Sequence, residues 1–310
     1  MDKEKILKKS LVVTGLAMIC TFLWGSAFPC IKIGYTLFNI ESSQTWSQVL
    51  FAGFRFLGAG LLTIIIGSLI NKRLIKPSKK SIPKVIKLST FQTILQYIFF
   101  YCGLARTTGV KSSIIEGANT FVAILISCLI FKYEKFNMKK LIGCILGFAG
   151  VVLVNVTSSG IDMNMKLTGE GFILLSVIAY GISSTMIKSY SKDENPVMLS
   201  GYQFIFGGLF MIIFSFIMGG RINTVSIEGI LMLIYLAFVS GIAYTLWGIL
   251  LKYNPISKVA VYGCMTPVFG VVLSAWWLQE TGQDLGIKAI IALILVCLGI
   301  LVVNSKNKEL

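Results

Sequence analysis

The chain repeats one pattern along almost its whole length: apolar stretches of about 20 residues alternate with short polar segments, ten times between Leu11 and Asn304. The hydrocarbon core of a bilayer is about 30 Å thick, so an α-helix rising 1.5 Å per residue needs about 20 apolar residues to cross it. The sequence therefore predicts an all-α polytopic membrane protein with ten transmembrane helices. The predicted helices cover residues 11–34, 46–70, 88–107, 110–131, 140–156, 169–188, 197–219, 227–251, 258–278 and 285–304.

The composition leaves no room for a second, water-soluble domain. Hydrophobic residues make up 55% of the chain and charged residues only 13%, which is too little polar surface to cover a soluble globule of this size. The longest polar intervals, 71–87 and 157–168, have the length of loops. We therefore expect neither a catalytic nor a nucleic-acid-binding module outside the bilayer.

The net charge of +15 is explained by where the basic residues lie. If the N-terminus is inside, three quarters of the 28 lysines and arginines fall on the inner side, seven of them in the loop 71–87. This asymmetry predicts a multi-pass protein of the cell membrane with both termini cytoplasmic. No aromatic residue is interleaved with the basic residues of that loop, so we expect no nucleic-acid partner.

Cysteine and histidine usage narrows the chemistry. All seven cysteines fall in apolar stretches without C-x-x-C spacing, and histidine is absent. We expect no disulfide framework, no metal and no cofactor, and any proton coupling would need a carboxylate. The chain also lacks the G-x-x-x-x-G-K-S/T motif, so this chain alone is not expected to use ATP.

The second half of the chain repeats the first. We expect one five-helix repeat over residues 11–156 and another over 168–304. Because five is odd, the two repeats must enter the membrane from opposite faces, and such inverted repeats allow a central site to face either side in turn. The aligned pairs include Trp24-Gly25 with Tyr180-Gly181, Glu116-Gly117 with Tyr262-Gly263, Thr120 with Thr266, and Gly150-Val151 with Gly299-Ile300.

Several of these segments resemble a known family. Trp24-Gly25-Ser26-Ala27-Phe28, Phe54-Arg55-Phe56 and the two blocks 112–155 and 258–304, each with a central glutamate (Glu134 and Glu280), look like a duplicated EamA domain of the drug/metabolite transporter superfamily. The resemblance implies a cavity enclosed by the first, third, fourth, sixth, eighth and ninth helices. It also implies transport of small metabolites such as amino acids, usually outward. Because an enzyme has no comparable need for inverted repeats, we expect no enzymatic activity. The alternatives are a nucleotide-sugar or sugar-phosphate transporter, a channel-like conduit and a membrane enzyme.

The first repeat departs from the family pattern at one position. The second repeat carries Pro267 before its glutamate, whereas the first has Asn119 at about the corresponding place. We therefore expect the fourth helix to be straighter than the ninth.

Ionisable and polar residues within the spans are the candidates for function, because each is costly in hydrocarbon unless it is paired or faces water. Arg55 and Glu116 lie at similar depths in the second and fourth helices, and we expect them to form a structural or coupling ion pair. Glu116 is also expected to hold a substrate amine or a proton. The predicted substrate-binding residues are Trp24, Gln96, Glu116, Asn119, Tyr180, Tyr244 and Tyr262. The expected partners are a small-molecule substrate and the lipid bilayer; the sequence leaves open whether the chain is a monomer or a homodimer.

Overall fold

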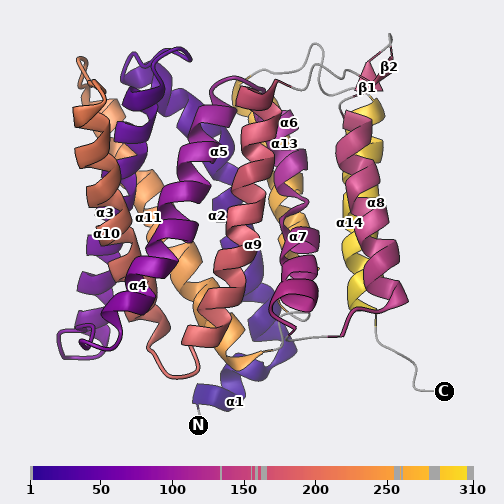
Figure 1. Cartoon of the computed structure of the whole chain (residues 1–310). Helices are drawn as coiled ribbons and strands as arrows, with labels where there is room; N and C mark the ends of the chain where they lie inside the picture. Colours follow the sequence, from indigo (N-terminus) through magenta and orange to yellow (C-terminus); the bar gives the residue numbers. More distant parts are fainter. Residues whose placement is uncertain are drawn as a thin grey trace.

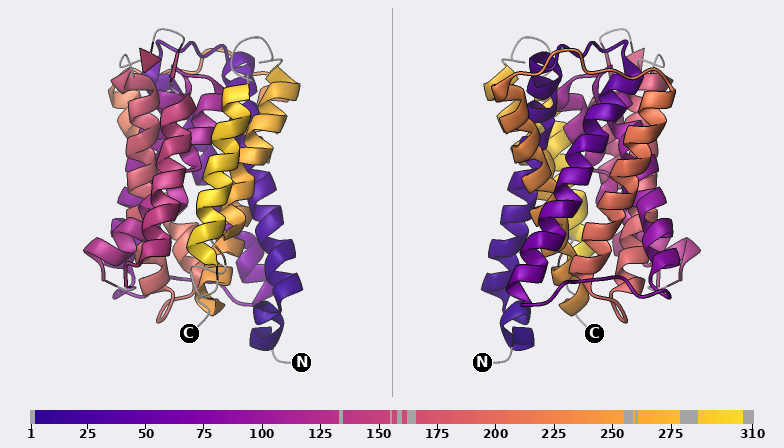
Figure 2. Two further views of the ribbon diagram at one scale, coloured as in Figure 1. Left: turned by 90° about the vertical axis from the view of Figure 1, so that its right-hand side faces the viewer. Right: turned by 90° about the vertical axis from the view of Figure 1, so that its left-hand side faces the viewer.

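The computed structural model of the protein describes residues 3–132, 135–154, 156–157, 160–161, 166–254, 259, 261–278 and 287–305. The described chain is a bundle of helices that run up and down, and both termini emerge at the same end (Figures 1 and 2). Glu134 and Glu280, together with the predicted range ends at 155, 258 and 285, lie outside the described part of the chain.

The elements follow the predicted order. The first half contains α1 (Lys3–Lys8), α2 (Ser10–Leu37), α3 (Thr45–Ile70), α4 (Ile82–Ser89), η1 (Thr90–Leu95), α5 (Gln96–Leu104), α6 (Gly109–Glu116), α7 (Asn119–Leu125), η2 (Ile126–Ile130) and α8 (Met138–Val154). The second half contains η3 (Leu167–Gly171), α9 (Phe172–Tyr190), α10 (Pro196–Ile217), α11 (Ile227–Tyr253), η4 (Val261–Cys264), α13 (Met265–Leu278) and α14 (Ile287–Asn304). Between the halves, β1 (Val156–Thr157) and β2 (Gly160–Ile161) form a two-residue antiparallel ladder.

The all-helical fold is confirmed, apart from this short ladder. Every predicted range overlaps a helix or a run of helices. Among the described residues, six helices are long and apolar enough to cross a membrane by themselves. The count of ten crossings stays a prediction.

Several helix ends differ from the prediction by one to three residues, and the start of the third helix differs by six. The third helix begins at Ile82 rather than at residue 88, with Pro83 in its first turn, where the missing N–H of proline is not needed. In the first turns of this helix Val85 and Leu88 are buried, whereas Lys84 and Lys87 are not. Because the lysines interrupt the apolar run, a search for apolar stretches misses these turns. The fifth helix ends at Val154, two residues before the predicted end.

The contacts between helices stay approximately the same when the two halves of the chain are exchanged. α3 packs along α10 and α8 packs along α14, and these are the second and fifth helices of the two repeats. Likewise α2 packs on α11 and α13, while α9 packs on α5 and α7. α2 runs away from the end that carries the termini and α9 runs back toward it (Figure 1). This is the arrangement that an inverted repeat requires.

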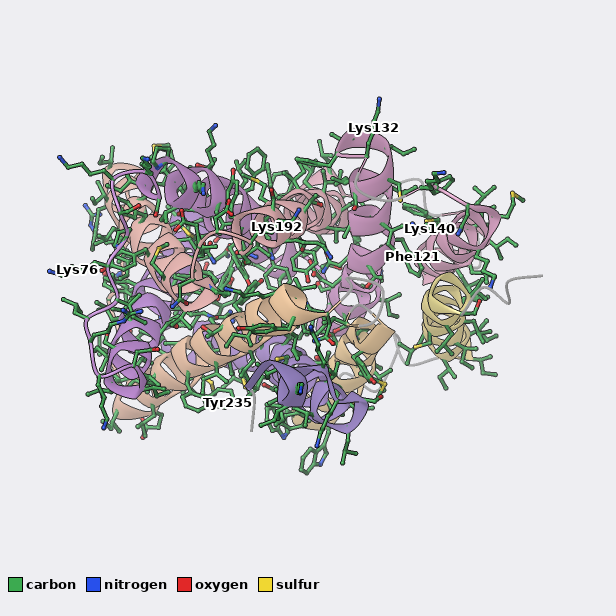
Figure 3. All side chains as sticks on the ribbon, turned by 90° about the horizontal axis from the view of Figure 1, so that it is seen from below. Lys76, Phe121, Lys132, Lys140, Lys192 and Tyr235 are labelled. Carbon is green, nitrogen blue, oxygen red and sulfur yellow. The ribbon has the colours of Figure 1, made fainter. Side chains whose placement is uncertain are left out.

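Glycines set how closely these helices approach. A Cβ on Gly60 of α3 would lie 2.6 Å from the carbonyl oxygen of Gly201 on α10, so the two backbones touch there. Small residues allow such contacts between membrane helices. α8 and α14 stand apart from the rest of the bundle when it is viewed from the end that carries the termini (Figure 3).

Phe121 of α7 provides a contact between the bundle and the outer α8–α14 pair. Its fully buried ring occupies a recess made by Gly147 and Gly299. We call this recess the glycine notch. A Cβ on Gly299 would lie 3.0 Å from Cζ of Phe121, so a side chain there would compete with the ring for space.

Basic side chains gather at the end of the bundle that carries the termini. Figure 3 labels Lys76, Lys132, Lys140 and Lys192 on this face. They come from four different connections or helix ends. This agrees with the sequence, in which most basic residues lie in every second connection between the predicted helices. The assignment of this face to the cytoplasm stays a prediction.

Candidate functional site

The fourth helix is broken in the middle of the bundle. α6 ends at Glu116 and α7 begins at Asn119, with Gly117 and Ala118 forming a turn between them. That the fourth helix is straighter than the ninth stays a prediction. The turn contains a glycine and no proline, and a side-chain hydrogen bond crosses it from Asn119 Nδ2 to Glu116 Oε2. In the second repeat, η4 ends at Cys264 and α13 begins at Met265, one residue beyond Gly263, the counterpart of Gly117.

A central cavity of about 110 Å³ lies against these two irregular segments. The cavity is smaller than the clefts of about 300–1,000 Å³ that hold drug-sized ligands. Its lining comes from the six helices that the family resemblance implied, with one further residue, Arg55, from α3. The lining residues are Trp24, Ala27, Phe28, Ile31, Arg55, Gln96, Tyr97, Phe100, Glu116, Gly117, Asn119, Thr120, Ala123, Ile124, Tyr180, Ser184, Thr185, Tyr244, Trp247, Leu251, Gly263 and Thr266.

The structure brings six of the seven predicted substrate-binding residues to this cavity. These are Trp24, Gln96, Glu116, Asn119, Tyr180 and Tyr244. Tyr262 is placed elsewhere: its hydroxyl is 2.5 Å from Thr14 Oγ1, and its neighbour Gly263 lines the cavity instead. Substrate contact at the six residues stays a prediction.

Arg55 is held by neutral partners on two helices. Its side chain is 2% exposed, and its Nη1 donates to the hydroxyl of Tyr101 on α5 over 2.7 Å. Its Nε donates to Ser240 Oγ over 2.9 Å and to the Leu236 carbonyl over 3.2 Å, both on α11. Among the described residues, no carboxylate lies within ion-pair distance of this guanidinium.

Glu116 has its own partners on the other side of the break. Its Oε1 accepts a hydrogen bond from Ser176 Oγ of α9 over 2.8 Å, and its Oε2 accepts from Asn119. The predicted ion pair between Arg55 and Glu116 is therefore not formed. Similar depth did not bring them together, because Arg55 is directed to α5 and α11 while Glu116 is tied to α9.

Several polar atoms at the cavity have no partner in the described structure. They are Trp24 Nε1, Gln96 Oε1, Asn119 Oδ1 and Thr266 Oγ1. Buried polar atoms in native proteins are nearly always hydrogen-bonded. These four atoms are therefore available to a ligand or to water that enters the cavity.

An aromatic network surrounds the polar atoms. The Tyr97 and Tyr244 hydroxyls are 2.6 Å apart, and Gln96 Nε2 donates to Tyr244 over 3.2 Å. The rings of Trp24 and Trp247 meet edge to face, 4.9 Å between centroids. The sequence predictions omitted Trp247 and Phe100, although Trp247 lies three residues after Tyr244 and thus on the same helix face.

A packed aromatic layer lies beyond one end of the cavity. Phe28 and Phe100 line the cavity and meet at 5.8 Å, and Tyr35, Phe51 and Tyr101 pack beyond them, farther from the termini. Tyr101 is fully buried there. Buried aromatic side chains therefore pack between the cavity and the end away from the termini.

The fold and this cavity define a polytopic helical membrane protein with a central site between two repeats. Residues 13–156 and 167–305 each match the EamA-like transporter family. The chain belongs to this family, as the resemblance of its motifs indicated.

Named relatives agree with this assignment. The chain is 28% identical over 309 residues to an uncharacterized transporter of Archaeoglobus fulgidus, covering 97% of this chain and 100% of that protein. It is 28% identical to the "Probable amino-acid metabolite efflux pump" of Escherichia coli K12, covering 86% of each chain. It is 26% identical to the chloroplastic WAT1-related protein At3g02690 of Arabidopsis thaliana, covering 85% of this chain but 63% of that protein. A solved crystal structure matches with a TM-score of 0.68 at 14% identity, over 94% of this chain and 95% of that one, which shows the shared fold.

Proposed function

We propose that this protein is a secondary transporter that exports small polar metabolites such as amino acids across the cell membrane by alternating access. The observation that carries the proposal is the cavity between the two repeats, where buried polar atoms have no partner among the residues that the structure describes. A site of this kind at an inverted-repeat interface, next to broken helices, suits a solute that is bound and released.

The charges at the cavity favour metabolites with few negative charges. Among the described lining residues, Arg55 is the cation and Glu116 is the anion. A sugar phosphate or a nucleotide sugar carries a compact multiple charge that calls for several cations. The amino-acid efflux relative from E. coli supports the same substrate class. In this proposal the metabolite crosses chemically unchanged, and a proton carried by Glu116 couples the cycle.

Counterflow in proteoliposomes tests the proposal. Vesicles loaded with a mixture of unlabelled amino acids should accumulate a labelled one above the level of protein-free vesicles, saturably and without a labelled product. Linear, unsaturable flux would indicate a conduit. A chemically altered label would indicate an enzyme.

A further inference from the structure

The central cavity carries two opposite charges that do not neutralise each other. Arg55 and Glu116 both line it, yet the hydrogen bonds of each go to neutral groups. A buried guanidinium without an anion loses hydration that neutral partners replace only in part. Among the described residues, neither Arg55 nor Glu116 is therefore neutralised by an opposite charge.

The guanidinium of Arg55 has donors to spare. It carries five N–H groups, and the described structure gives acceptors to Nε and Nη1 alone, so Nη2 is without one. The rings of Phe56, Tyr97 and Tyr101 lie 5.1, 5.9 and 6.0 Å from its central carbon and fix its plane. A fixed guanidinium edge with open donors matches a carboxylate, which accepts two parallel hydrogen bonds.

The Glu116 side offers acceptors instead. The carboxylate of Glu116 is joined to Asn119, whose own Oδ1 is buried without a partner in the described part of the chain. Gln96, only 5% exposed, likewise leaves its Oε1 unpartnered at the cavity. An ammonium group has three donors and no acceptor, and needs this kind of surrounding.

We propose that the cavity binds a zwitterion in one orientation, with its carboxylate on Arg55 and its ammonium group against Glu116 and Asn119. The inference rests on the proposed transport function and specifies which residues bind the two charged groups of the substrate. The remaining wall is aromatic, made by Trp24, Phe28, Phe100, Tyr180 and Trp247, and it receives an apolar side chain. Arg55 and Glu116 are thus specificity-determining residues, each for one end of the substrate.

Matched ligand series test the orientation in the wild-type protein. Alanine, leucine and phenylalanine are each compared with their amide, which lacks the carboxylate, and with their deaminated acid, which lacks the amine. Competition against counterflow in proteoliposomes should show both analogues at least tenfold weaker than the parent amino acid. Equal competition by the amide or by the deaminated acid overturns the inference without any variant.

Variants then assign each end to its residue. Arg55→Gln should reduce the preference for acid over amide to less than twofold and keep the preference for the amine. Glu116→Gln should reduce the preference for the amino acid over its deaminated acid to less than twofold and keep the preference for acid over amide. Arg106→Gln is the matched control, because Arg106 is bonded to Cys102 and Thr45 away from the cavity, and both preferences should survive there. If Arg55→Gln does not fold, Arg55→Lys is used instead. It keeps the charge but not the two parallel hydrogen bonds, so it should reduce the preference for acid over amide. An unchanged preference in the folded Arg55→Lys protein contradicts the assignment.

Failure of the inference differs from failure of the transport function. Counterflow of other metabolites with no response to any amino acid overturns the zwitterion site alone. Absence of counterflow for every metabolite tested overturns the proposed function.

Discussion

At the residue scale, Arg55 is the group whose surroundings the sequence described least well. Its depth in a span marked it as costly, but its actual stabilisation comes from a phenol, a hydroxyl and a carbonyl on two other helices. Depth along a helix follows from residue counting, whereas the direction of a side chain depends on how helices cross. The same reason explains why Tyr262 points to Thr14 and not into the cavity.

Removing the phenol hydroxyl that meets Arg55 should be costly. Tyr101→Phe deletes a buried hydrogen bond to a charged donor, a class that contributes about 1.5–3 kcal/mol. We expect the apparent Tm in detergent to fall by several degrees. Thermal unfolding followed by intrinsic fluorescence measures this change.

A tyrosine with a neutral partner is the control. Tyr202 donates to the Ile75 carbonyl over 3.1 Å, so Tyr202→Phe should cost less, about 0.5–1.5 kcal/mol. Equal losses for both variants would show that the charge of Arg55 adds nothing to its hydrogen bond with Tyr101.

At the element scale, the sequence predicted which segments are helical but not how they are interrupted. Apolar periodicity reports on burial and length, and Gly117 alone is compatible with a continuous helix. The turn depends on Asn119 reaching Glu116 and on Ser176 of another helix holding that carboxylate. Such a combination is set by tertiary packing. The helices that enclose the cavity were named correctly because the family resemblance, and not residue patterning, supplied them.

The glycine notch should not tolerate a methyl group. A Cβ at Gly147 would overlap the ring of Phe121, and overpacking of this kind costs about 1–3 kcal/mol. We expect Gly147→Ala to lower the apparent Tm, and Phe121→Leu to recover part of the loss in the double variant.

Gly15→Ala provides the comparison, because Gly15 is exposed on α2 and a Cβ there meets nothing within 4 Å. This change should be neutral or stabilising by up to about 1 kcal/mol. Strictly additive effects of Gly147→Ala and Phe121→Leu would mean that ring and glycine do not interact.

At the scale of the whole molecule, a polar contact joins the two repeats at the end that carries the termini. Lys84 Nζ of α4 is 3.0 Å from Glu194 Oε1, and Ser81 donates to the same carboxylate. Burial by itself raises the pKa of Glu194, but the hydrogen bonds from Lys84 and Ser81 outweigh it and leave the pKa below its ordinary value.

This contact should depend on pH in a defined direction. A lowered folded-state pKa stabilises the protein above the unfolded-state pKa of about 4.3, and the contribution is lost as pH falls through the folded value. Glu194→Gln should cost about 1 kcal/mol or less at pH 7, since both side chains are partly exposed. The difference in apparent Tm from wild type should shrink below about pH 4. A difference that grows on acidification would contradict the lowered pKa.

The orientation in the membrane can be read by cysteine labelling in a background without native cysteines. Ser78 is exposed at the end that carries the termini, and Asn223 is exposed in the connection between α10 and α11 at the opposite end. An impermeant thiol reagent should label Asn223→Cys in intact cells and Ser78→Cys only after permeabilisation. The reverse result would place both termini outside.

The position of Phe121 on α7 also links the outer surface of the protein to its interior. Glu116 faces the cavity five residues before the ring that fills the glycine notch, and α7 is two turns long. α7 continues without a gap into η2. A shift of α7 would therefore either move the Phe121 ring out of the glycine notch or carry α8 and α14 with it. That outer pair presents Ile145 and Ile294 to the surroundings. One ring and two glycines therefore join this outer, apolar-faced pair to the segment that follows Glu116 at the cavity.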